Sequence, residues 1–280
     1  MDIDTKTNRK YKDSVFTLLF SEKEKLIELC NAFLDTDYGP DTDVQITTLR
    51  NVLFMEQVND ISFVIDGKLV VLIEHQSTIN QNIPLRMLLY IARVYEKICK
   101  NKDLYRIKKI KIPRPEFIVA YNGKDDYPDE QVLRLSDMFA KYGEKNPVEL
   151  ELLVKVYNIN KGHNPQIAQK SKTLSDYEIF IDMIRKYKEE TNNLAGAVTQ
   201  AVNECIKQNI LKSFLETHGS EVANMLLTEW KLEDALKVRE EEGFERGERK
   251  NKEETLKAVE ELLKQGVTDA EEILKKLREM

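Results

Sequence analysis

Asp60, Glu74 and Gln76 are the residues whose types and spacing suggest chemistry most directly. Asp60 opens the β-rich run DISFVI, and Glu74 and Gln76 end the run LVVLIEHQ, with Asp66-Gly67 between the two runs. Asp-Gly is a strong signal for a tight hairpin. We therefore expect the three side chains at one open end of a largely apolar sheet, where polar groups are costly unless something binds them.

The length of the hairpin loop decides whether Asp60 and Glu74 share a face of the sheet. A two-residue loop would pair Asp60 with Ile73 and turn its side chain away from Glu74, because side chains alternate along a strand. A longer loop or a bulge would shift the pairing by one residue and set Asp60 beside Glu74. We predict the shifted register. Adjacent carboxylates favour a cation between them, so the sequence predicts a Mg²⁺ (or Mn²⁺) site that activates water and stabilises a phosphodiester transition state.

The elements around these residues predict an α/β fold. A capping box at Ser21 and Glu24 predicts a helix over residues 21–34, and an apolar stripe predicts a second helix that starts at Pro84 and covers the sheet. From residue 175 onward the pattern is helical. Short runs rich in β-branched residues predict strands over 60–65, 69–76, 115–123 and 150–159.

The 280-residue chain is long enough for a domain with a sizeable core plus an appendage. We predict a core over residues 1–175, a helical region over 176–236 and a charged helical tail over 237–280. The tail is interpreted as a solvated helix or flexible segment, with homo-oligomerisation through its short C-terminal helices as the alternative. A helix-turn-helix interpretation is disfavoured, because its second helix begins with acidic residues.

Charge is segregated along the chain. The formal net charge of −6 gives no global attraction to nucleic acid. A local basic cluster is the exception, and it is interpreted either as a DNA-binding surface or as the solvated end of a helix. Arg86 and Tyr90 lie one helical turn apart and could reach the site, although Tyr90 is equally compatible with the core. The basic cluster consists of Lys97, Lys100, Lys102, Arg106, Lys108, Lys109, Lys111 and Arg114.

The composition also indicates where the protein is expected and which kinds of site it lacks. We expect no membrane association, because the sequence has no signal-like segment and no apolar run long enough to cross a bilayer. Three widely spaced cysteines argue against a disulfide framework and indicate a reducing, cytoplasmic location. Phosphate-binding glycine loops, nucleophile elbows and paired His/Cys metal motifs are absent from the sequence.

Asp60, thirteen intervening residues and then Glu74-His75-Gln76 resemble the PD-(D/E)XK nuclease motif in its variant with Gln in place of Lys. Asp13, a following aromatic cluster, Arg86 with Tyr90, and a Glu/Arg/Gly-rich tail narrow the resemblance to the recombination-promoting nuclease, or transposase, family. The resemblance covers about Tyr11 to Lys250. The aromatic and apolar residues of that cluster are Phe16, Leu19 and Phe20.

That resemblance implies a restriction-endonuclease-like core, with a mixed central sheet flanked by helices and a helical C-terminal region. It implies that Asp60 and Glu74 bind the metal, that the backbone carbonyl of His75 completes its shell, and that Gln76 orients the attacking water. The implied activity is endonucleolytic cleavage of DNA, linked to recombination or mobile elements.

Two departures from the family pattern keep an alternative open. Thr17 stands where the family often has Lys, and Asn59 occupies the position of the Pro that names the superfamily. Gln76 also cannot supply the positive charge of a Lys. The alternative function is a catalytically inactive scaffold of the same fold that binds DNA or protein. Without their context, the three site residues would also fit a solvated rim of the sheet.

Overall fold

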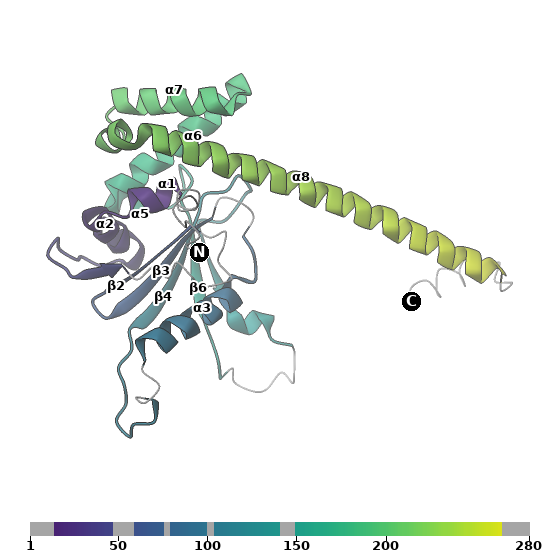
Figure 1. Cartoon of the computed structure of the whole chain (residues 1–280), viewed down its shortest axis with the longest axis horizontal. Helices are drawn as coiled ribbons and strands as arrows, with labels where there is room; N and C mark the ends of the chain where they lie inside the picture. The colour runs from purple at the N-terminus through teal and green to yellow at the C-terminus, as the bar shows by residue number, and fades with distance from the viewer. Residues whose placement is uncertain (1–13, 47–58, 76–78, 100–103, 141–148, 265–280) are drawn as a thin grey trace, which may run out of the picture. The chain divides into compact units, whose positions relative to one another are not determined.

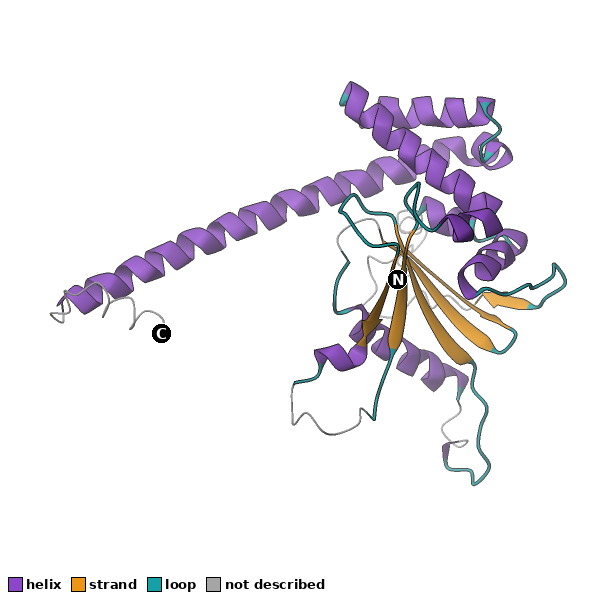
Figure 2. Ribbon diagram, turned by 180° about the vertical axis from the view of Figure 1, so that it is seen from behind, coloured by secondary structure: helices purple, strands orange, loops and turns teal. Residues whose placement is uncertain are grey.

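The computed structural model describes residues 14–46, 59–75, 79–99, 104–140 and 149–264. The chain divides into two compact units, Met1–Thr228 and Glu229–Met280. Most elements belong to the first unit (Figures 1 and 2). Its strands are β1 (Val44–Ile46), β2 (Asn59–Ile65), β3 (Lys68–His75), β4 (Arg114–Tyr121), β5 (Glu130–Arg134) and β6 (Leu153–Asn158).

The strands form one six-stranded mixed sheet in the order β1-β2-β3-β4-β6-β5. The central strands β3, β4 and β6 are parallel, while β1, β2 and β5 pair with their neighbours antiparallel. The α/β expectation is therefore confirmed. The carboxyl ends of the three parallel strands meet at one edge of the sheet, which we call the carboxyl edge.

Asp66 and Gly67 form the β2–β3 turn, with φ angles of 47° and 70°. Positive φ at both central residues is the signature of the two-residue type I′ hairpin, which Asp-Gly favours. The strands pair without interruption from Ile65↔Lys68 to Asn59↔Glu74, so Asp60 pairs with Ile73. The predicted shifted register is wrong, because the turn closes in two residues and no bulge inserts an extra one.

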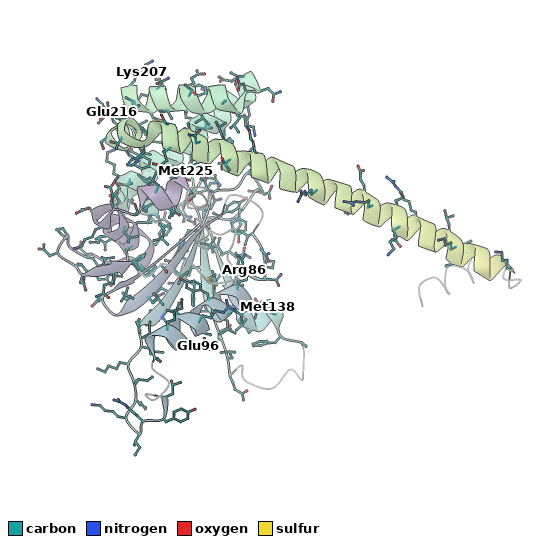
Figure 3. All side chains as sticks on the ribbon, viewed as in Figure 1. Arg86, Glu96, Met138, Lys207, Glu216 and Met225 are labelled. Atoms are coloured by element: carbon teal, nitrogen blue, oxygen red, sulfur yellow. The ribbon has the colours of Figure 1, made fainter. Side chains whose placement is uncertain are left out.

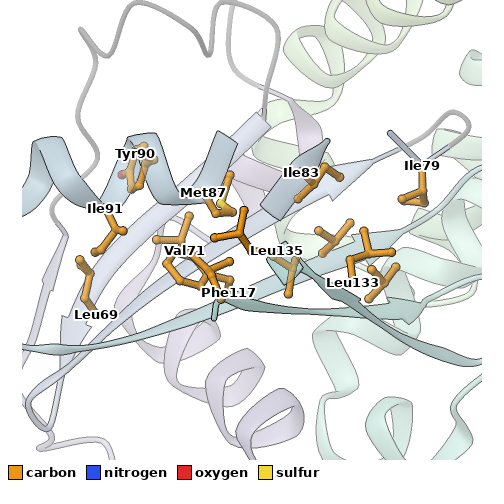
Figure 4. Close-up of a cluster of buried hydrophobic side chains, with 14 of the residues drawn as sticks. Leu69, Val71, Ile79, Ile83, Met87, Tyr90, Ile91, Phe117, Leu133 and Leu135 are labelled. Carbon is orange, nitrogen blue, oxygen red and sulfur yellow. The ribbon is translucent and has the colours of Figure 1, made fainter. Parts of the chain in front are cut away.

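Helix α3 (Ile83–Ile98) covers one face of the sheet (Figure 4). Pro84 stands at its start, where the missing N–H of proline costs nothing. Met87 and Tyr90, each 1% exposed, pack with Val71 and Phe117 in one apolar cluster. Truncating a buried side chain of this size costs about 2–5 kcal/mol, so this layer contributes much of the stability of the sheet.

Helices α1 (Val15–Leu19) and α2 (Lys23–Leu34) come before the sheet in the chain. Ser14 caps α1 by accepting a hydrogen bond from the backbone N–H of Thr17. The predicted capping box at Ser21 is wrong: Glu22 is the N-cap of α2 without a side-chain bond, and the Ser21 hydroxyl donates to the carbonyl of Leu18.

The face of the sheet opposite α3 is covered by α2. Val156 of β6 belongs to the core under α3, so the adjacent Tyr157 points to the other face. There the ring of Tyr157 lies 5.4 Å from that of Phe33 on α2. The sheet is therefore flanked by helices on both faces, as the family resemblance implied.

The predicted helical region after residue 175 is confirmed and begins earlier. It contains α5 (Pro165–Lys170), α6 (Lys172–Thr191), α7 (Leu194–Lys207) and α8 (Lys212–Lys264). Helix α8 continues through the charge-dense segment 239–254, which agrees with the interpretation of this part of the tail as a helix. The tail from residue 265 onward lies outside the described residues. The predicted boundaries of the three regions stay predictions.

Candidate metal and nucleic-acid site

The β2–β3 hairpin holds the backbones of Asp60 and Glu74 in neighbouring strands near the carboxyl edge. Asp60 is the second residue of β2, and Glu74 and His75 are the last two of β3. The side chains of Asp60, Glu74 and His75, and the whole of Gln76, lie outside the described parts. Their predicted roles therefore stay predictions.

The register assigns Asp60 and Glu74 to different rows of the sheet. Asp60, Ile73 and Val119 form one row, and Val119 belongs to the core under α3. Asn59, Glu74 and Ala120 form the next row, which alternation assigns to the opposite face. The two acidic residues are thus brought to one edge of the sheet, but not to one face.

A polar cluster lies at the same edge, one residue beyond the paired strands. His75 pairs with Tyr121, and Asn122 follows directly. Arg185 of α6 donates to both the backbone carbonyl and the side-chain oxygen of Asn122, and at 2.6 Å to the side-chain oxygen of Asn160. Asn160 in turn donates to Asn158 and to the carbonyl of Gly123. The loops after β4 and β6 are therefore tied together next to the end of β3.

The amide of Asn122 is held in one orientation. Its oxygen accepts from Arg185 at 3.2 Å, so its nitrogen must point the other way. That nitrogen is buried and has no hydrogen-bond partner among the described residues, while the residue as a whole is 1% exposed. An unsatisfied buried donor costs about 1–3 kcal/mol, so this amide lowers the stability of the edge unless a further group accepts from it.

His163 and Asp129 form a further pair in the loops that follow β4 and β6. The Nδ1 atom of His163 lies 2.6 Å from a carboxylate oxygen of Asp129. The backbone carbonyl of Asp129 accepts from the amide of Asn164 and from the backbone N–H of Asn158. Sequence reasoning missed this pair, because its members are 34 residues apart and neither spacing nor motif links them.

Burial shifts the ionisation of several groups around the sheet. It raises the pKa of the Tyr121 hydroxyl, which donates to the carbonyl of Asp125 at 3.0 Å. It raises the pKa of the Cys30 and Cys205 thiols to about 12, so both stay protonated and unreactive near neutral pH. All three cysteines are free, in agreement with the predicted absence of disulfides.

The sequence left open whether Tyr90 of α3 reaches the candidate site or packs in the core, and the structure places it in the core. Its hydroxyl contacts Ser62 of β2 at 2.7 Å within the core, so Tyr90 joins helix to sheet. Arg86 is half-buried in the first turn of α3 (Figure 3). This end of the helix follows the carboxyl end of β3 in the chain. Its predicted contact with DNA stays a prediction.

The predicted basic cluster lies at the other edge of the sheet. Lys97 is in the last turn of α3, and Arg114 opens β4 opposite Lys68, the first residue of β3. Eight paired residues of β3 and β4 separate this amino edge from the carboxyl edge. Lys100 and Lys102 lie outside the described residues. The exposed members are Lys97, Arg106, Lys108, Lys109, Lys111 and Arg114.

Within the described side chains, no group of three or more His, Cys, Asp or Glu residues could hold a metal ion. The side chains of Asp60, Glu74 and His75 are not among those described, so this absence does not bear on the predicted site. None of the described helices has both the length and the apolar character needed to cross a bilayer. The predicted cytoplasmic location stays a prediction.

Comparison with known protein families identifies the family of this chain. Residues 12–232 match the family model described as "Putative transposase, YhgA-like". No curated protein and no solved structure matches the chain. The match spans both the candidate site and the helices that follow the sheet, which is well over half of the sequence. The chain therefore belongs to the YhgA-like putative transposase family.

Proposed function

We propose that this protein is a metal-dependent DNA endonuclease of the PD-(D/E)XK type, linked to recombination or mobile elements. The observation that carries the proposal is the β2–β3 hairpin, which holds Asp60 and Glu74 in neighbouring strands at one end of the sheet. Membership of a transposase family supports it, because transposases act on DNA. The mixed sheet flanked by helices is compatible with a restriction-endonuclease-like core.

The donor set fits a hard divalent cation. Two carboxylates and a backbone carbonyl, from Asp60, Glu74 and His75, are oxygen ligands of the kind that Mg²⁺ or Mn²⁺ prefers. When bound, such an ion lowers the pKa of water and stabilises negative charge on a phosphodiester. Because Asp60 and Glu74 belong to different rows, we propose that their carboxylates meet around the open end of the hairpin and not on one face.

Gln76 would orient the attacking water or a phosphate oxygen through its amide group. An amide supplies no charge, so positive charge has to come from elsewhere in the chain. Arg86, in the first turn of α3, is our candidate for contacting a phosphate near the carboxyl edge. The lysines of the amino edge are candidates for contacting the DNA backbone further along the duplex.

A second candidate function is a DNA- or protein-binding scaffold with an inactive site. The register supports this alternative, because the backbone pairing puts Asp60 opposite Ile73 and Glu74 opposite Asn59, in different rows of the sheet. The endonuclease predicts both DNA binding and cleavage, whereas the scaffold predicts binding of DNA or of a protein without cleavage.

The test is a cleavage time course on supercoiled plasmid in Mg²⁺, in Mn²⁺ and in excess EDTA. We expect nicking that requires metal and falls at least about a hundredfold in Asp60→Ala and Glu74→Ala, since each removes a ligand of the ion. Glu130→Ala, which removes an exposed carboxylate of β5, is the matched control and should cleave like the wild type. Intact plasmid under every condition, together with retarded DNA on a gel, would favour the scaffold.

A further inference from the structure

The connection between α3 and β4 exposes an unusual number of large apolar side chains. We call residues 104–113 the arm. Ile107 is fully exposed at 106%, Tyr105 is 89% exposed and Leu104 is 60% exposed. Ile110 and Ile112 are 39% and 46% exposed. Apolar side chains gathered in this way on a surface mark a site of interaction.

Cations alternate with these apolar residues along the arm. Its sequence, LYRIKKIKIP, contains Arg106, Lys108, Lys109 and Lys111 and no acidic residue. All four are exposed. In a chain with a net charge of −6, this is a strongly positive segment. The arm therefore suits a partner that is anionic on its surface and apolar inside.

The arm extends past the amino edge of the sheet (Figure 1). Helix α3 and strand β4, which connect the two edges, have 16 and 8 residues. At about 1.5 Å per helical residue and about 3.3 Å per strand residue, both give a separation of about 25 Å between the edges. A duplex that crossed both edges would cover about seven base pairs at about 3.4 Å each.

We propose that the arm docks on duplex DNA, with its lysines on the phosphates and with Tyr105 and Ile107 as an apolar wedge at a base step. The inference rests on the proposed function, which takes DNA as the substrate. Wedges of this kind partly unstack a base step and bend the duplex by about 20–90°. Such a bend would change the path of the duplex relative to the carboxyl edge, where Asp60 and Glu74 lie.

Two other partners would suit an apolar and basic segment less well. A second copy of this chain would need a continuous apolar face, and here a cation interrupts nearly every apolar position. An anionic bilayer would match the charge, but the described part of the arm forms no amphipathic helix that could lie in the interface. Alternating cations and single apolar side chains suit a duplex, which presents phosphates next to stacked bases.

The test is the binding and bending of a 30-base-pair duplex labelled at both ends, measured by fluorescence anisotropy and energy transfer in EDTA. EDTA prevents cleavage, so the measurement is independent of the nuclease. The wild type should bring the two ends closer. Tyr105→Ser with Ile107→Ser should abolish that bend and leave the salt dependence of binding unchanged. Lys108→Gln with Lys109→Gln should reduce the slope of log K against log salt by about 2, because two phosphate contacts are lost.

Leu150→Ser is the matched control, since it removes an apolar side chain that is 49% exposed outside the arm. It should bind and bend like the wild type. Equal bending and equal salt slopes in all variants would overturn the inference. A change in oligomer mass, or in binding to anionic vesicles, without a change in DNA bending would assign the arm to a second copy or to a bilayer. Bending without cleavage in any metal would reject the nuclease alone.

Discussion

The guanidinium of Arg185 donates to the side-chain oxygen of Asn122 at 3.2 Å and also to its backbone carbonyl. Its other terminal nitrogen donates to Asn160 at 2.6 Å. One side chain of α6 thus holds the loops that leave β4 and β6, next to the strand end that carries Glu74 and His75. The shape of the carboxyl edge depends on this contact.

Arg185→Met should therefore destabilise the protein by about 2–4 kcal/mol, because it leaves several buried acceptors without their charged donor. The free energy of unfolding in urea measures this loss. Arg134→Met is the matched control: Arg134 is 51% exposed and lies 3.9 Å from Glu151, so its loss should cost less than about 0.5 kcal/mol. Equal losses in both variants would contradict a special role for Arg185.

A double-mutant cycle on Tyr90 and Ser62 should measure the free energy of the hydrogen bond between α3 and β2. Their hydroxyl groups lie 2.7 Å apart in the core. Tyr90→Phe and Ser62→Ala should each cost about 1 kcal/mol, and the double variant should cost less than the sum by about 0.5–1 kcal/mol. Additive losses would mean that the hydrogen bond itself contributes nothing. Unfolding by urea with an unchanged m-value is the appropriate measurement.

Glu178 should make stability depend on pH. Burial raises the pKa of its carboxyl group from 4.5 to about 8, so the folded state keeps the proton that the unfolded state releases. A raised pKa in the folded state stabilises the protein below about pH 4.5, and this stabilisation is lost as the pH rises toward 8.

Glu178→Gln removes that titration. As the pH rises from 5 to 8, the wild type should therefore lose stability that Glu178→Gln keeps. The free energy of unfolding of the variant should rise relative to that of the wild type by an amount on the order of a few kcal/mol. Glu190→Gln, at an exposed position of the same helix, is the control and should follow the wild type. Parallel curves for Glu178→Gln and the wild type would show that Glu178 ionises normally in the folded state.

Local chemistry made the hairpin predictable, and an assumption about function made its register wrong. Asp66-Gly67 favours a turn of two residues with positive φ, and the structure has that turn. The prediction of a shifted register rests on the assumption that a metal site requires Asp60 on the same face as Glu74. The conformational preference of Asp-Gly fixes the backbone of the turn, and the turn fixes the register. A metal site does not require one particular register, because side chains at the end of a strand can reach an ion from either face.

Other features had too little local signal to be predicted. Strand β5 was missed because Leu133 is its single buried residue, so its pattern shows no alternation. The Arg185 cluster was missed because its members lie 63 and 25 residues apart in sequence. Contacts of that kind depend on the packing of α6 against the loops after β4 and β6, and a single sequence does not encode them as a motif.

The ligands of the metal can be identified without measuring cleavage. An ion that binds the folded state alone stabilises it, by about 1.4 kcal/mol at ten times Kd. Mn²⁺ should therefore raise the melting temperature of the wild type, and this increase should be absent from Asp60→Asn and Glu74→Gln. Both substitutions keep the size of the side chain and remove its charge.

Asn59→Ala tests whether Asp60 or Asn59 is the ligand that β2 contributes, because Asn59 is the residue that pairs directly with Glu74. If the carboxylates meet around the end of the hairpin, Asn59→Ala should keep the Mn²⁺ effect. If Asn59→Ala and Glu74→Gln lose it while Asp60→Asn keeps it, the ligand is the residue opposite Glu74 and the assignment of Asp60 is wrong. A Mn²⁺ effect that survives in all three variants would move the metal site away from this hairpin.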